Sequence, residues 1–116
     1  MKRFAILLIL AATFVAVPAQ AKLRVFACEP EWASLLHELA GDRIDVDVAT
    51  SALQDVHVVE AKPSLIAKVR EADLAVCTGA ELEVGWLPQL VRQSGNTRIA
   101  SGPGSFSAAM QVKRLE

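Results

Sequence analysis

His57 is the residue of this sequence whose type best suits the chemistry of a binding site. It lies in the segment QDVHVVE, residues 54–60, where a carboxylate stands on either side of it. A neutral imidazole binds zinc or another divalent transition ion, and Asp55 or Glu60 could orient the ring or add an oxygen ligand. An ordinary hydrogen-bonded loop histidine shows the same local pattern, so spacing alone leaves both interpretations open.

The other polar candidates have simpler explanations. His37 falls on the helical face away from the apolar residues around it, which predicts an exposed surface histidine. Asp45 and Asp47 alternate with apolar residues, as on the solvated face of a strand. Glu81 and Glu83 could face a cleft after a strand, but placement near a helix N-terminus explains acidic residues there as well, and we favour that explanation.

Cys28 and Cys77 end two apolar runs that are expected to be central strands. If these strands are neighbours, a disulfide is geometrically possible, and two small buried apolar residues are an equal alternative. Two cysteines are too few for a disulfide scaffold. Neither lies near a histidine or in a Cys-x-x-Cys motif, and the sequence lacks a Ser/His/Asp set and a glycine-rich phosphate loop. We therefore expect no enzyme active site.

Strands and helices alternate along the chain. Strand patterns occur at residues 23–28, 44–48, 74–77 and, more weakly, 98–101. Helices are predicted to begin at Pro30, at Pro63 and at about Val84. The first helix carries an apolar stripe of Trp32, Leu35, Leu36 and Leu39.

This order predicts an α/β fold, a parallel sheet with flanking helices. Ligands bind such sheets at the turns that follow the strands, and the loop at residues 50–62 is the one of these turns that holds a histidine.

The chain begins with a pattern typical of export. Residues 1–21 combine a basic start, a short apolar core and a small-x-small cleavage site, which predicts a secretory signal peptide and a periplasmic location. We expect residues 22–101 to form the α/β lobe and residues 102–116 an irregular tail. The 12 basic and 13 acidic residues show no run of either sign, which argues against nucleic-acid binding. The residues after the signal peptide contain no further long apolar stretch, so we expect no membrane span once the signal is cleaved.

Four ordered motifs stand at informative intervals: LRVFACEPEW, LAGDRI, QDVH followed by EAKPS, and ADLAVCTGAELE followed by GWL. In this order they resemble the zinc/manganese-type periplasmic solute-binding proteins of metal ABC transporters. The resemblance implies a protein that captures Zn²⁺, alternatively Mn²⁺, and delivers it to a membrane permease. It implies that His57 is a metal ligand and that Glu60 is a supporting residue. Val56 departs from the family pattern, which has a proline before the histidine.

The resemblance also implies that the site is incomplete within these 116 residues. Members of the family are longer, with two α/β lobes, and take further ligands from beyond the region matched here. We therefore expect one incomplete lobe of a two-lobe fold that lacks most metal ligands. The alternative is an exported adhesive or receptor-like binding module without metal function.

Overall fold

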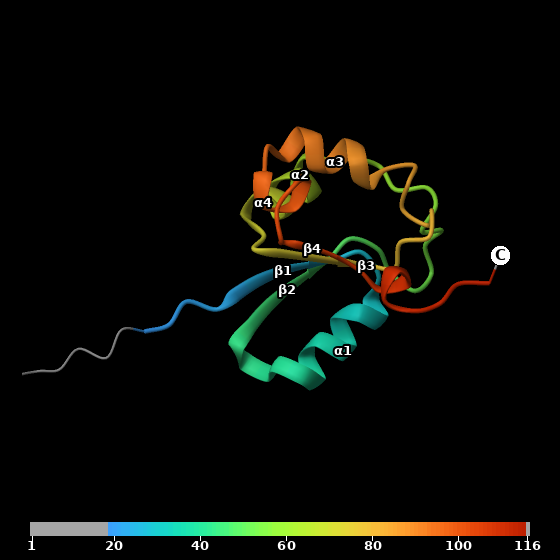
Figure 1. Cartoon of the computed structure of the whole chain (residues 1–116). Coiled ribbons are helices and arrows are strands. Elements are labelled where there is room, and N and C mark those ends of the chain that lie inside the picture. The colour runs from blue at the N-terminus through green and yellow to red at the C-terminus, as the bar shows by residue number, and fades with distance from the viewer. Residues whose placement is uncertain (1–18, 116) are drawn as a thin grey trace, which may run out of the picture.

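Four parallel strands form the centre of the structure, a computed structural model that describes residues 19–115. The predicted signal peptide lies almost entirely outside the described residues. The order across the sheet is β2, β1, β3, β4 (Figure 1). The strands are β1 (Leu23–Ala27), β2 (Ile44–Val48), β3 (Leu74–Cys77) and β4 (Ser105–Ser107). The predicted α/β class, a parallel sheet with flanking helices, is confirmed.

Helices cover both faces of the sheet. Figure 1 shows α1 (Pro30–Ala40) on one face and α2 (Pro63–Glu71), α3 (Leu87–Ser94) and α4 (Thr97–Ala100) on the other. Two short 3-10 helices, η1 (Gly41–Arg43) and η2 (Ala108–Gln111), follow α1 and β4. None of the helices in the described part of the chain is long and apolar enough to cross a membrane.

The two faces of the sheet carry separate apolar clusters because successive strand residues point to opposite sides. Phe26 is fully buried toward α2, α3 and α4, where it meets Trp86 and Leu90. Its neighbour Val25 packs with Ile44 on the side of α1. The larger cluster therefore lies beneath α2 and α3, beside the connections that follow β2 and β3.

The ends of the helices follow local chain chemistry. Pro30, Pro63 and Pro88 occupy the first turns of α1, α2 and α3, where a missing N–H costs nothing. Gly95 ends α3 with φ of 69°, a left-handed conformation that glycine adopts without strain. The predicted start of α3 at about Val84 is three residues early. Residues 80–86 instead form turns.

Two expectations about the second half of the chain were wrong. Residues 97–100 form α4 and not a strand, because the Asn96 side chain accepts from the Arg98 amide and caps a helical turn. Residues 105–107, expected within an irregular tail, form β4 against β3, with Val76 opposite Phe106. A strand of three residues is too short to show a period.

The apolar stripe of α1 is only partly buried. Trp32 and Leu36 pack toward the sheet, whereas Leu35 and Leu39 are 48% and 70% exposed. The covered side of α1 consists of Trp32, Ala33, Leu36 and Ala40, and the other two leucines of the stripe lie outside it.

The stability of the lobe should depend on the cluster beneath α3. Leu90→Ala empties a site that is fully buried, so the free energy of unfolding should fall by about 2–5 kcal/mol in urea titrations. Leu39→Ala is the matched control, since the same change at a 70% exposed helical site should shift it by less than about 0.5 kcal/mol. Equal losses in the two variants would contradict this packing.

Candidate functional site

His57 lies in the loop after β2 and is held by Asp55. The His57 side chain is 65% exposed, and its Nδ1 lies 2.9 Å from Asp55 Oδ1. The same oxygen accepts the backbone N–H of His57 at 2.9 Å. These two hydrogen bonds, the backbone one first, lower the pKa of Asp55. A carboxylate that fixes Nδ1 leaves Nε2 as the ring nitrogen able to bind an ion.

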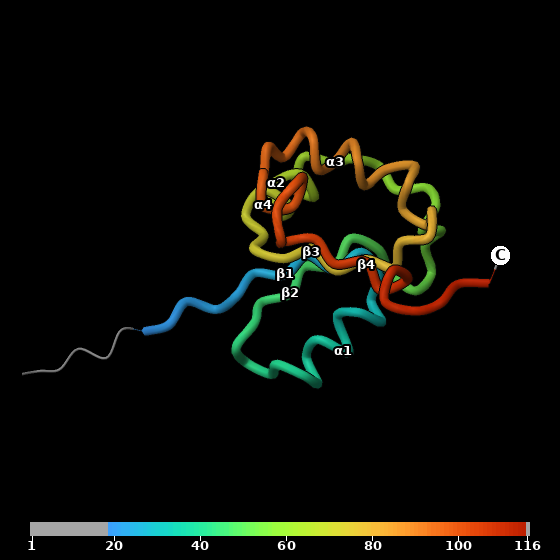
Figure 2. The backbone as a smooth tube through the Cα atoms, in the orientation of Figure 1, coloured from blue at the N-terminus to red at the C-terminus, as the bar shows by residue number. Residues whose placement is uncertain are grey.

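The loop that carries His57 is attached to the segment after β3. The indole N–H of Trp86, a 2% exposed residue, donates to the Val56 carbonyl at 2.7 Å. Gly85 lies so close that a Cβ there would stand 3.1 Å from the His57 carbonyl oxygen. Figure 2 shows the two connections passing beside each other at the carboxyl ends of the strands. A side chain of the core thus sets the position of His57.

Glu60, the predicted supporting residue, is exposed and lines a shallow hollow of about 370 Å³ with Gln54 and Ser64. Within residues 19–115 its carboxylate makes no hydrogen bond to His57. The structure therefore joins His57 to Asp55 and not to Glu60. The metal-binding role of His57 stays a prediction.

Two buried carboxylates lie together at the carboxyl ends of the strands. No sequence pattern indicated that they would pair. Glu29 is 1% exposed and Glu83 is 3% exposed. Glu29 Oε2 accepts from Thr78 Oγ1 at 3.0 Å, and Glu83 accepts the amide N–H groups of Thr78 at 2.8 Å and Gly79 at 3.0 Å. Trp32 Nε1 in turn donates to Thr78 Oγ1 at 2.8 Å.

The favoured explanation for Glu83, placement of an acidic residue near a helix N-terminus, does not describe what its side chain does. Its carboxylate ties the turn that follows β3, where Ala80 and Glu81 have φ of 53° and 72°. The Thr78 and Gly79 amides have no partner in a strand or a helix, and the Glu83 side chain turns inward to accept from them. No periodicity in the sequence could indicate this, and Glu29 carried no signal beyond its place after a strand.

Burial raises the pKa of Glu29 from 4.5 to about 7, helped by a hydrogen bond with Glu83 and by the charge of Glu83. The hydrogen bonds from Thr78 act in the opposite direction but are weaker. A proton shared between two buried carboxyl groups lessens their repulsion. The pair therefore holds a proton near neutral pH.

Cys28 and Cys77 form a disulfide, with their Cα atoms 4.9 Å apart. The alternative of two unlinked apolar residues was wrong. β1 and β3 are neighbours, and the Cys28 amide donates to the Val76 carbonyl at 2.9 Å, so the two cysteines end adjacent strands at one level. The sulfur atoms and a Glu83 carboxylate oxygen all lie within 4.8 Å of one another.

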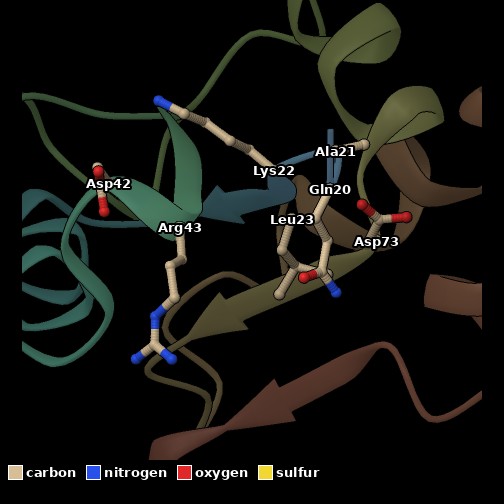
Figure 3. A pocket seen from close by; sticks show the side chains of 7 residues that line it. All are labelled: Gln20, Ala21, Lys22, Leu23, Asp42, Arg43 and Asp73. Carbon is tan, nitrogen blue, oxygen red and sulfur yellow. The ribbon is translucent and has the colours of Figure 1, made fainter. Parts of the chain in front are cut away.

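A more voluminous hollow, of about 630 Å³, lies at the other end of the sheet (Figure 3). Lys22, Arg43 and Asp73 line it, around the start of β1. Asp73 accepts the Arg24 amide at 3.0 Å, and Lys22 pairs with Asp45 at 3.6 Å. Lys22 and Asp73 thus already have partners, and the hollow lies away from the carboxyl ends of the strands, where ligands of such sheets bind.

The sequence matches a family model over residues 25–113, that of the periplasmic zinc-uptake complex component A. The chain belongs to this family. It is a family of substrate-binding components of transport systems, and the resemblance inferred from the four motifs is confirmed.

The curated relatives are named as binding proteins for different metals. The chain is 32% identical over 110 residues to a manganese ABC transporter substrate-binding lipoprotein of Streptococcus anginosus, covering 84% of the chain and 36% of that protein. It is 32% identical over 80 residues to an iron ABC transporter substrate-binding lipoprotein of Streptococcus pyogenes, covering 66% of the chain and 26% of that protein. The chain thus spans about a third, or less, of the length of these relatives.

Solved structures of the family share the fold. The chain superimposes on a crystal structure of ZnuA with a TM-score of 0.69 at 25% identity, covering 83% of the chain and 35% of that structure. A periplasmic metal-binding protein of Candidatus Liberibacter asiaticus gives a TM-score of 0.67 at 19% identity, with similar coverage. The observed α/β lobe is therefore one part of a larger family architecture.

Glu29 should make the lobe less stable as the pH rises. Its pKa is raised in the folded state, so its contribution is fully present below about pH 4.5 and is lost as the pH approaches about 7. Relative to Glu29→Gln, the free energy of unfolding of the wild type should fall across this range by up to about 3 kcal/mol. Urea titrations at several pH values measure the difference.

Glu31→Gln, an exposed change two residues away, is the matched control and should follow the wild-type pH profile. Parallel profiles for the wild type and Glu29→Gln would contradict the raised pKa.

Proposed function

We propose that this chain is the ion-binding part of an extracytoplasmic component of a metal ABC importer, which captures zinc and delivers it to a membrane permease. Membership of the family supports the transport role. The observation that carries the assignment to a site is the pairing of His57 Nδ1 with Asp55 at 2.9 Å. That pairing fixes the ring and makes Nε2 the metal-binding atom, as in carboxylate–histidine–zinc arrangements.

Capture in this proposal needs no catalysis. His57 supplies one nitrogen from an exposed loop, so an ion can reach it without opening the core, and Glu60 supports the site from the same loop. A zinc site usually takes three or four protein ligands. In this proposal His57 is one member of such a ligand set and not the whole of it.

Zinc is the proposed ion because imidazole is a ligand of intermediate softness that suits zinc, while manganese prefers oxygen ligands. Manganese is the alternative, favoured if the remaining ligands are carboxylates. We further propose that residues 1–21 direct export to the periplasm.

His57→Ala should weaken zinc binding by about tenfold or more, because the imidazole nitrogen is lost and no other histidine stands nearby. Isothermal titration of the disulfide-bonded chain measures the affinity. His37→Ala is the matched control, an exposed histidine on α1 that should bind zinc like the wild type. Equal affinities for the wild type and His57→Ala would contradict the assignment.

Asp55→Asn should reduce the affinity for zinc by about 10-fold to 100-fold while leaving the fold unchanged. The amide can still accept the Nδ1 proton but no longer adds a negative charge behind the ring. An Asp55→Asn protein that binds zinc as tightly as the wild type would mean that Asp55 does not orient the ligand.

A further inference from the structure

We propose that Cys28, Cys77 and Glu83 form a second, redox-gated metal site, which binds zinc when the disulfide is reduced. The site is separate from the exposed imidazole of His57, because all three of its residues are buried. It therefore stands whether or not His57 binds the transported ion.

The pairing of β1 with β3 holds the two sulfur atoms close together, in addition to the bond between them. β1 and β3 pair in parallel from Val25 opposite Leu74 to Ala27 opposite Val76, and the Cys28 amide bonds to the Val76 carbonyl. Reduction removes the sulfur–sulfur bond but leaves this pairing in place. Two thiols then remain side by side at the ends of neighbouring strands.

Glu83 brings an oxygen ligand to the same point. One of its carboxylate oxygens lies within 4.8 Å of both sulfur atoms, and its position is fixed by the amides of Thr78 and Gly79. Ligands of one zinc ion are bound about 2.0–2.3 Å from the metal, so donor atoms this close to one another need only small shifts to share an ion.

Glu29 adds a second buried carboxylate beside these three groups, and none of its oxygens is among the three ligand atoms. It shares the Thr78 amide with Glu83, and its Oε1 is the one buried side-chain oxygen or nitrogen in the described part of the chain that accepts no hydrogen bond from an N–H or O–H of the chain. A divalent ion bound by Cys28, Cys77 and Glu83 would lower the energetic cost of this buried acidic pair.

Thiol–disulfide exchange controls whether the two cysteines can bind a metal. A dithiol reductant gives two electrons and two protons to the Cys28–Cys77 disulfide and becomes a cyclic disulfide, which leaves two cysteine thiols. Zinc then binds the two thiolates, and the two thiol protons pass to solvent. Oxidation by a disulfide reverses the sequence and releases the ion. Zinc is the expected metal, since thiolates select soft or borderline ions.

Cobalt(II) provides the test because its bond to thiolate gives a charge-transfer absorption that histidine and carboxylate ligands do not. The chain is reduced with excess dithiothreitol, freed of reductant under argon and shown by alkylation and mass measurement to carry two thiols. We expect one equivalent of cobalt to give the thiolate band in the reduced chain, zinc to displace it, and the oxidised chain to lack it. His57→Ala should keep the band.

Glu83→Gln separates a built site from two adventitious thiols. In the reduced chain it should weaken cobalt binding by about tenfold, since even residues one shell removed from a metal contribute that much. Glu81→Gln, its exposed neighbour, should bind like the wild type. Absence of the thiolate band in a chain with two verified thiols, or equal affinities for the wild type and Glu83→Gln, would overturn the proposal.

Discussion

The parallel pairing of β1 with β3 is the constraint on which the rest of this structure depends. It makes Cys28 and Cys77 neighbours and thereby allows the disulfide. It also brings Glu29, which follows β1, against Thr78, which follows β3. If another strand lay between β1 and β3, the same residues would lie too far apart along the edge of the sheet to make these contacts. The contact of Cys28 with Cys77 and that of Glu29 with Thr78 both depend on this adjacency.

The second constraint is the attachment of the histidine loop to the core. The indole of Trp86 fills the apolar cluster beneath α3 with its rings and holds the Val56 carbonyl with its N–H. A long polar loop on a small lobe would otherwise have little to define its path. The transport role proposed for His57 therefore rests on packing as well as on the hydrogen bonds that His57 donates to Asp55. The buried acidic pair, by contrast, lies inside, and its raised pKa predicts that the stability of the lobe depends on pH.

The sequence predicted those features that follow from local pattern. Apolar runs located β1 and β3, and alternation of apolar and acidic residues located β2. Prolines located the starts of α1 and α2, and Gly95 marked the end of α3. The sequence failed where long-range contacts decide the outcome. β4 exists because β3 offers it an edge, and the burial of Glu83 depends on amides that a turn leaves without partners. The residue type and the family motifs were enough to single out His57. They did not decide whether Asp55 or Glu60 is its partner, because that depends on the path of the loop.

The central claim is that His57 binds the ion through Nε2 while Asp55 holds Nδ1. Long-range nitrogen–proton NMR spectra of the ¹⁵N-labelled, disulfide-bonded chain resolve both ring nitrogens of both histidines during a zinc titration. The account predicts that zinc shifts the Nε2 resonance of His57, that its Nδ1 stays protonated, and that the ring of His37 is unchanged. Unchanged resonances of His57 at saturating zinc, or equal shifts in the two histidines, would contradict it.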